Sequence, residues 1–202
     1  MKHASTKTDA LKQLARRQLI IRPRDLDELQ IPRNYLGRFV ALGLLRKLQR
    51  GLYSSPESNI SEHHSLIEVG RKVPKAVICL LSALRFHELT TQTPREVWIA
   101  VDVKSWKPTL SYPPIRLVRF SGKALRFGIR EHRMEGTVLR VFTPAKTVAD
   151  CFKFRNKIGL DVALEALRET YRKRKATTDE LWAAAKVCRV TRVIRPYMET
   201  LG

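Results

Sequence analysis

Hydrophobic residues recur at helical spacing in the first segments of the chain. Within and just after residues 6–18, Leu11, Leu14 and Leu19 fall on one side of a helix, while basic residues face the other way. Residues 22–29 predict a second, shorter helix, because a proline stands near its start and acidic residues follow in the first turn. Two amphipathic helices therefore open the chain.

A third helix is predicted from about Arg33 onward, after an interruption that contains a proline. Leu36 and Phe39 lie on its inner side, and Gly43 stands where a helix of this length would stop. Residues 44–54 then form two short runs with hydrophobic positions around a tight turn, which predicts a hairpin. Three helices followed by a basic hairpin is the layout of a winged helix-turn-helix.

A polar stretch over residues 54–61 predicts a linker, and the remainder of the chain mixes strands and helices. The predicted strands are 76–80, 96–101, 115–120, 129–134 and 138–142, and the predicted helices are 61–72, 82–89, 160–171 and 190–201, with two more that begin after Thr143-Pro144 and at a capping box formed by Thr177 and Glu180. We therefore expect an α+β protein with a winged helix-turn-helix domain over residues 1–58. A mixed α/β domain with a small sheet and C-terminal helices would follow over residues 59–202.

The charge of the chain is strongly positive. It carries 39 Lys and Arg against 19 Asp and Glu, a formal net charge of +20. Both parts share the excess, since 12 basic and 5 acidic residues precede residue 59. A polyanion is the partner that this charge favours, because each neutralised phosphate releases a condensed counterion. A membrane surface is the weaker alternative, since no stretch approaches the roughly 20 hydrophobic residues of a membrane span.

The three cysteines, Cys79, Cys151 and Cys188, are odd in number and far apart. This argues against a disulfide framework and against a tetrahedral metal site, and their hydrophobic contexts predict reduced core residues. The first residues lack the hydrophobic run and the cleavage site of a secretory signal. We expect a cytoplasmic protein without metal or cofactor.

The third helix and the hairpin carry the residue types that bind DNA. Arg can form two hydrogen bonds to guanine and Asn two to adenine, and a basic hairpin tip can reach the minor groove or the flanking phosphates. The arginines at the start of the second helix stand near backbone N–H groups that suit a phosphate. The candidate DNA contacts are Arg22, Arg24, Arg33, Asn34, Tyr35, Arg38, Arg46, Lys47, Arg50 and Tyr53.

Two positions on the third helix leave alternatives open. Tyr35 either packs inward or points its hydroxyl at a phosphate. Gly37 stands inside the helix, where glycine costs about 1 kcal/mol relative to alanine. Close approach to the DNA backbone and close packing on the first helix would each explain it. A solvated surface explains any one of the arginines equally well, so the DNA interpretation depends on the combination of helix spacing, basic hairpin and charge.

Charged residues of the second domain predict further surfaces. Arg116, Arg119 and Arg140 interleave with hydrophobic neighbours, as in a sheet with one solvent-exposed face. Lys146 and Asp150 lie four apart on a predicted helix, the spacing of a surface ion pair. A basic cluster follows, and contact with nucleic acid, contact with an acidic partner or a solvated helix end would each explain it. The candidate partner or phosphate contacts there are Lys146, Lys153, Arg155 and Lys157.

The enzyme alternative is a metal-dependent nuclease. Asp102 and Lys104 follow a predicted strand, and with Glu68 or Glu88 they would supply two carboxylates for Mg²⁺ and a lysine to assist the attacking water. A strand that simply leaves the sheet gives the same pattern. The histidines lack partners at metal-ligand spacing, and no glycine-rich phosphate loop or nucleophile elbow occurs. A further alternative is an interaction module whose charge serves solubility or RNA binding. We expect a regulator rather than an enzyme.

Several segments in one order resemble the AbiEi family, the antitoxins of type IV toxin–antitoxin (abortive infection) systems. The segments are IPRNYL at 31–36, RGLY at 50–53, LSALRFHELTTQ at 81–92, PREVW at 94–98 and TPAKTVADCF at 143–152. Together they extend the resemblance over nearly the whole chain, about residues 10–200.

This resemblance implies a transcriptional repressor of its own operon, whose winged helix binds inverted repeats in promoter double-stranded DNA. It also implies that the second domain counters a toxin that resembles nucleotidyltransferases, without forming a stable complex with it. Family members also occur without an evident toxin, so the resemblance supports the repressor role more strongly than the antitoxin role.

Overall fold

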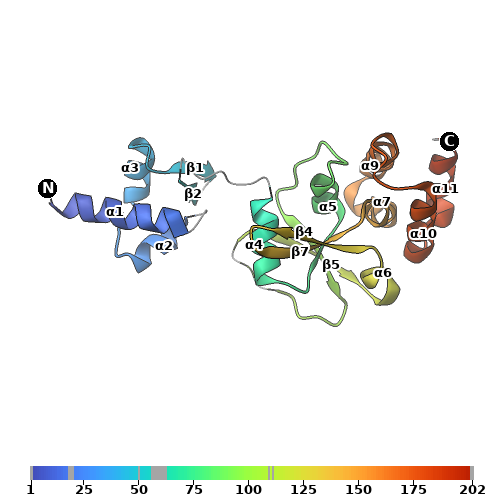
Figure 1. The fold of residues 1–202 in the computed structure, drawn as a ribbon, viewed down its shortest axis with the longest axis horizontal. Helices are drawn as coiled ribbons and strands as arrows, with labels where there is room; N and C mark the ends of the chain where they lie inside the picture. The colour runs from blue at the N-terminus through green and yellow to red at the C-terminus, as the bar shows by residue number, and fades with distance from the viewer. Residues whose placement is uncertain are drawn as a thin grey trace. The chain divides into compact units, whose positions relative to one another are not determined.

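The fold was analysed in a computed structural model, which describes residues 2–17, 21–49, 51–55, 63–108, 110 and 112–200. The chain divides into two compact units, residues 1–61 and residues 62–202 (Figure 1). Helices and strands occur in both units, so the predicted α+β class is confirmed. Most of the predicted linker, residues 56–61, lies outside the described residues.

Unit 1 contains three helices and a two-stranded hairpin, an arrangement compatible with the predicted winged helix. The elements are α1 (Lys2–Arg17), α2 (Pro23–Glu28), α3 (Tyr35–Ala41), β1 (Arg46–Gln49) and β2 (Leu52–Ser54). One cluster of buried side chains joins them, made of Leu11, Ile21, Leu26, Ile31, Leu36, Phe39 and Leu45. The predicted inner faces of the three helices therefore meet in a single core.

The chain segment between α1 and α2 fastens the hairpin to the helices. Ile21 donates its N–H to the carbonyl of Tyr53 at 2.7 Å and accepts the N–H of Tyr53 at 2.9 Å. This antiparallel bridge adds one residue of a third strand beside β2. After the C-terminal end of α3, Gly43 has a φ of +68°, a conformation that suits glycine. The helix ends just before this glycine, as predicted.

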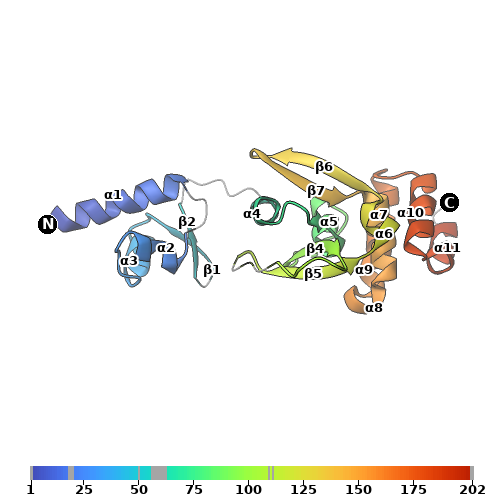
Figure 2. The ribbon, with the colours of Figure 1, turned by 90° about the horizontal axis from the view of Figure 1, so that it is seen from below.

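Unit 2 places a five-stranded mixed sheet among helices. Its elements are α4 (His64–Lys72), β3 (Val77–Ile78), α5 (Leu80–Phe86), β4 (Val97–Asp102), β5 (Ile115–Phe120), α6 (Gly122–Arg126), β6 (Ile129–Met134), β7 (Thr137–Phe142), α7 (Pro144–Lys153), α8 (Arg155–Ile158), α9 (Leu160–Arg172), α10 (Thr178–Cys188) and α11 (Thr191–Glu199). All five predicted strands are present, and the short helices α6 and α8 are additions to the prediction. The strand order is β5-β4-β3-β7-β6, so β5 and β6 lie at opposite edges (Figure 2).

The interior strand β4 is covered on both faces, which corrects the expectation of a sheet with one fully solvent-exposed face. Along β4, Val97 and Ile99 join the core under α4, while Trp98 and Ala100 join a second core that includes α7, α9 and α10. The run of buried residues in β4 is what a strand covered on both sides requires. The interleaved arginines of β5 reflect its position at the edge of the sheet.

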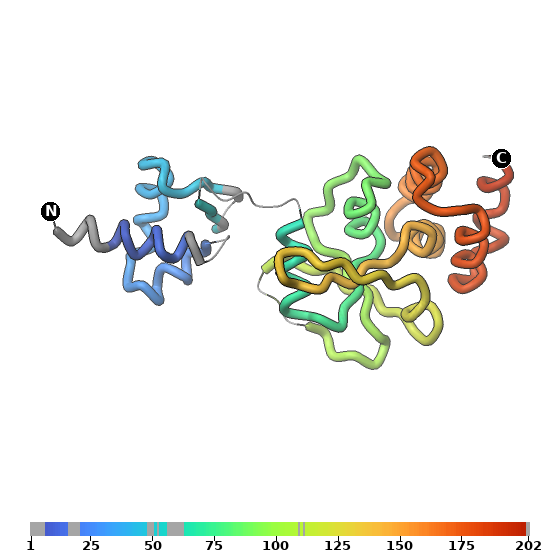
Figure 3. Tube along the Cα trace, in the orientation of Figure 1, coloured from blue at the N-terminus to red at the C-terminus, as the bar shows by residue number. Residues whose placement is uncertain are grey.

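The C-terminal helices form a layer beside α7, as the tube in Figure 3 shows. Thr177 and Glu180 make the predicted capping box at the start of α10. The Glu180 N–H donates to the Thr177 hydroxyl at 3.2 Å, and the Thr177 N–H donates to the Glu180 carboxylate at 2.8 Å. Local sequence signals therefore locate this helix start correctly.

The ion pair between Lys146 and Asp150 lies in the core, so the predicted surface position is wrong. Both side chains are 0% exposed. Asp150 also accepts a hydrogen bond from the Cys188 thiol at 3.2 Å, and the Lys146 ammonium lies 4.1 Å from the centroid of the Phe142 ring. Because α7 packs against α5, α9 and α10, the side of the helix that carries the pair faces inward. Lys146 therefore cannot contact a partner from this position.

Candidate nucleic-acid interface

The third helix of unit 1, α3, has one buried side and one exposed side. Leu36 and Phe39 are buried, whereas Gly37 and Arg38 are exposed. The turn before the helix holds Arg33 and Asn34, both exposed, and the Asn34 side chain does not cap the helix. The predicted outer face of the third helix is therefore accessible.

Gly37 faces open space. A Cβ atom added there would have no heavy atom of the described residues within 4 Å. The described part of α1 therefore does not pack closely on this position, and of the two explanations considered for Gly37 the close approach of an external molecule is the one that these residues leave open. The α3 backbone carries no side chain at this point, so a bulky polymer such as a phosphate backbone can come close to it.

Arg33 forms an ion pair with Asp27 of α2. The guanidinium donates from Nε to Oδ1 at 3.0 Å and from Nη2 to Oδ2 at 2.5 Å, a two-point arrangement. The hydrogen bonds from Arg33 lower the pKa of Asp27, and the same bonds raise the pKa of Arg33. Arg33, a predicted DNA contact, is therefore engaged by a carboxylate of its own unit.

Tyr35 packs inward, and two cations lie near its ring. The ring lies against the core cluster of unit 1. The Lys7 ammonium is 4.9 Å from the ring centroid and the Arg38 guanidinium is 5.9 Å from it. Each contact has the geometry of a cation–π interaction. Lys7 was missed in the sequence, since no local pattern indicates that α1 comes beside the start of α3.

The hairpin displays basic side chains on its first strand. Arg46 and Lys47 are exposed and pair with β2 in an antiparallel register that shifts between Lys47 and Gln49. Tyr53 is half-buried against the core, which leaves its ring less accessible than predicted. Arg50, the predicted tip residue, lies outside the described residues.

The start of α2 does not offer the free phosphate site suggested by its sequence. The N–H of Arg22 donates to the Asp25 carboxylate at 2.7 Å, so this backbone donor already has an anionic acceptor. Arg24 is exposed, with its Nε atom 3.9 Å from Asp25. An acidic side chain thus occupies the position that a phosphate would take, and any DNA contact here would come from the side chains of the two arginines.

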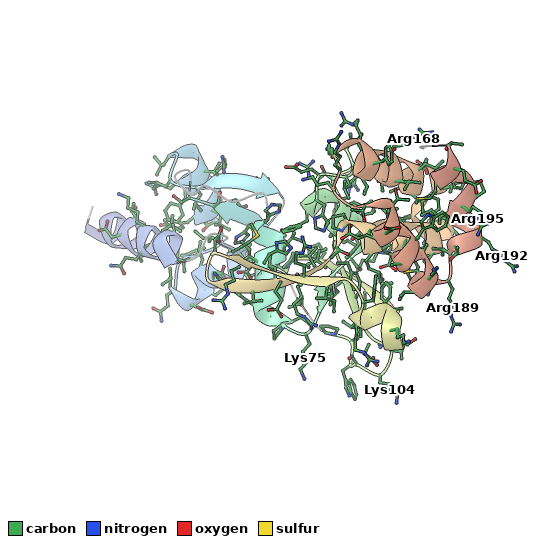
Figure 4. All side chains as sticks on the ribbon, turned by 45° about the vertical axis from the view of Figure 1, so that its right-hand side comes forward. Lys75, Lys104, Arg168, Arg189, Arg192 and Arg195 are labelled. Atoms are coloured by element: carbon green, nitrogen blue, oxygen red, sulfur yellow. The ribbon has the colours of Figure 1, made fainter. Side chains whose placement is uncertain are left out.

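The cations of unit 2 are spread over several elements. Figure 4 labels six exposed ones, on the loop before β3, the loop after β4, α9, the C-cap of α10, and α11: Lys75, Lys104, Arg168, Arg189, Arg192 and Arg195. Of the predicted basic cluster, Lys153 and Lys157 are exposed, while Arg155 donates to the carbonyl of Phe152 at 2.9 Å. A distributed positive charge of this kind attracts polyanions without selecting a sequence.

The side chains proposed for a nuclease are engaged elsewhere. The Asp102 carboxylate accepts the N–H of Lys104 at 2.9 Å and so closes a local turn after β4. Glu68 pairs with Lys72 at 2.8 Å, and Glu88 lies near a lysine of the loop after α9. Among the described residues, no group of three or more His, Cys, Asp or Glu side chains is placed to hold a metal ion. The geometry gives the nuclease alternative no support.

The three cysteines are free and buried, as the sequence indicates. Burial raises the pKa of the Cys79 and Cys151 thiols well above the ordinary value, and burial with the nearby Asp150 charge raises that of Cys188 to about 12. All three are therefore neutral thiols rather than nucleophiles or metal ligands at neutral pH.

Three of the four histidines of unit 2 come together around the ring of Phe86. The rings of His63, His87 and His132 lie 5.0, 5.2 and 4.8 Å from it, centroid to centroid. The Nε2 atom of His87 lies 2.7 Å from the carbonyl oxygen of Phe142, and burial lowers the pKa of His87 to about 4. His87 is thus a neutral hydrogen-bond donor in a packed aromatic cluster.

Comparison with known proteins connects unit 1 to one family. Residues 9–56 match the family model of the AbiEi antitoxin transcriptional regulators, so the resemblance seen in the sequence is confirmed for this segment. The match spans α2, α3, the hairpin and most of α1. No curated protein matches the chain. None of the helices in the described part is both long and apolar enough to cross a membrane.

Proposed function

We propose that the protein is a sequence-specific DNA-binding repressor of its own operon and the antitoxin of a type IV toxin–antitoxin system in the cytoplasm. Residues 1–58 act as the winged helix-turn-helix domain and bind inverted repeats in the promoter. Residues 59–202 act as the antitoxin domain. Its counterpart is a toxin that resembles nucleotidyltransferases, which the antitoxin counters without a stable complex.

The accessible side of α3 is the observation that supports DNA binding most directly. Gly37 leaves the helix backbone open, and Arg38 stands beside it as an exposed donor. The hairpin of the same unit exposes Arg46 and Lys47, which suit phosphate contacts. These features lie within the segment that matches a family of transcriptional regulators.

Footprinting on the DNA upstream of the protein's own gene tests the repressor role. Protection of an inverted repeat is expected. Arg38→Ala should cost about 1–3 kcal/mol at the specific site and relax the base preference there. Lys47→Ala should weaken binding to all sequences alike and lower the salt slope by about one.

Arg168→Ala is the matched control, because Arg168 is an exposed arginine of unit 2 outside the proposed interface. Loss of DNA affinity in the control as large as that in Arg38→Ala would show that the charge acts without a defined interface. Binding that does not change between low and high salt would contradict phosphate contacts altogether.

Co-expression with a nucleotidyltransferase-like toxin from the neighbouring gene tests the antitoxin role separately. The full chain should restore growth, and so should the Arg38→Ala variant, because the antitoxin domain does not need the DNA interface. Failure of both to restore growth would leave a repressor without antitoxin activity. Rescue by the wild type alone would show that protection acts through repression.

A further inference from the structure

A groove runs along the outer edge of the sheet in unit 2, where β5 has no neighbouring strand among the described residues. Its volume is about 680 Å³. The lining residues are Trp98, Arg116, Leu117, Val118, Arg119, Phe154 and Lys157. They come from β4, β5 and the segment where α7 passes into α8, so a strand edge and a short helix form the two walls.

The backbone of β5 offers unpaired hydrogen-bonding groups to this groove. The carbonyls of Pro114 and Phe120 point toward β4, since they accept N–H groups from Val97 and Val103 at 2.8 and 3.0 Å. Successive residues of a strand point their backbone groups in opposite directions. The N–H and C=O groups of Leu117, and of its neighbours two positions away, therefore point to the open edge. Such an edge is a template for one more strand.

The side chains around the edge are cationic, and the aromatic faces beside them are already covered. The Arg116 guanidinium lies 4.9 Å from the Trp98 ring centroid, and the Lys157 ammonium lies 5.7 Å from the Phe154 ring centroid. Arg116 also donates to the exposed carboxylate of Glu96 at 3.4 Å, so an incoming carboxylate would share or replace this partner. Trp98 itself is only 8% exposed. Bases of a single-stranded nucleic acid need free aromatic faces for stacking. These covered rings therefore favour an acidic polypeptide over a nucleic acid.

A second copy of the chain is disfavoured at this edge. It would bring the same two arginines, Arg116 and Arg119, to a strand that already carries them, and like charges across a strand pair are destabilising. The Arg119 side chain is also engaged within its own chain, because its Nη1 donates to the carbonyls of Asp102, Val103 and Ser105 at 3.2, 2.8 and 2.9 Å. The occupant therefore has to bring opposite charge.

We propose that the edge of β5 binds an extended acidic segment of another protein, which adds a strand beside β5 and places its carboxylates near Arg116 and Lys157. Main-chain hydrogen bonds would supply affinity, and the two cations would select acidic side chains at alternate positions. This interaction surface is independent of the proposed DNA interface in unit 1.

Fluorescence anisotropy of the full chain with labelled peptides tests the proposal. The probe is a ten-residue peptide of alternating Glu and Val, and its counterpart has Lys in place of Glu. The Glu peptide should bind and the Lys peptide should not. Two further probes carry N-methyl groups on all Glu amides or on all Val amides. Alternate amides point to opposite edges of a strand, so only one of the two methylated peptides should lose binding.

Paired charge reversals locate the site. The double variant Arg116→Glu with Lys157→Glu should lower the affinity for the Glu peptide by about fivefold or more, since two attractive contacts become repulsive. Arg168→Glu with Arg192→Glu changes the net charge equally on exposed residues of α9 and α11, and it should have less than about a twofold effect. Amide exchange adds a readout on the wild-type protein, because the peptide should slow exchange of the Leu117 and Arg119 N–H groups.

Four results would overturn the proposal. Equal weakening by both charge reversals would show attraction by net charge alone. Equal binding of both methylated peptides would exclude strand addition. A ten-residue oligothymidylate is the third test. If it binds, and if the Arg116 and Lys157 reversals weaken its binding as much as that of the Glu peptide, the groove is a nucleic-acid surface. Absence of binding by the Glu peptide would mean that the cations only protect the edge against self-association.

Discussion

The guanidinium of Arg33 holds the carboxylate of Asp27 through two hydrogen bonds of 3.0 and 2.5 Å. The pair joins the end of α2 to the turn that precedes α3, and both side chains are exposed. In the winged-helix interpretation, Arg33 lies where it would meet DNA, so a phosphate or a base competes with Asp27 for the same donors. Under the proposed function, the carboxylate would orient Arg33 before binding and compete with DNA for its donors.

Asp27→Asn should raise DNA affinity by about two- to fivefold at moderate salt, because it releases Arg33 from a carboxylate. Electrophoretic shift titrations check this. The same substitution in an Arg33→Ala background is the control. An equal gain in DNA affinity there would show that Asp27 acts only as a negative charge near the DNA. A gain seen only in the protein that retains Arg33 would show competition for the guanidinium.

Gly37→Ala should stabilise the fold and weaken DNA binding. Alanine is the better helix former by about 1 kcal/mol, and the structure leaves room for its methyl group. The same methyl group would obstruct a DNA backbone that approaches α3 closely. Urea unfolding and a shift assay measure the two effects on one variant. If stability rises while affinity stays unchanged, DNA does not approach the helix at this residue.

Lys146→Met should destabilise unit 2 by about 3–5 kcal/mol, since it leaves the Asp150 carboxylate buried without its cation. Lys146→Met combined with Asp150→Leu should cost much less, because neither charge then remains in the core. Lys153→Met, on an exposed side of the same helix, serves as the control and should change stability by less than about 0.5 kcal/mol. Thermal or urea unfolding distinguishes these cases, and a double variant as unstable as the single one would contradict the role of the pair.

His87 should make the fold less stable in mild acid. Its pKa is about 4 in the folded protein against an ordinary value of 6.5, so the unfolded chain takes up the proton first as the pH falls. Its contribution is therefore complete above pH 6.5 and is lost progressively between pH 6.5 and 4, with a full magnitude of about 3 kcal/mol at most. Unfolding of the wild type and of His87→Gln at pH 7.5 and 4.5 checks this. If the wild type loses no more stability between pH 7.5 and 4.5 than His87→Gln does, His87 is not the group responsible.

The amino-acid pattern accounts for much of this fold because the relevant signals are local. The spacing of Leu36 and Phe39 identifies the buried side of α3, Gly43 ends that helix, and the capping box at Thr177 begins α10. Each signal arises from contacts within one or two helical turns, so neighbouring residues are sufficient to read it. The same holds for the family resemblance of the N-terminal segment, which depends on residues contiguous in the chain.

Only the tertiary structure decided which residues face which partner. Lys146 and Asp150 have the spacing of a surface pair, yet both are buried, because the packing of three helices around α7 and not the spacing sets which side faces inward. Lys7 reaches Tyr35, and Asp27 engages Arg33, through the way that the helices pack. Sequence separation hides such contacts, since the charge on a side chain is a local property and its neighbours in space are not.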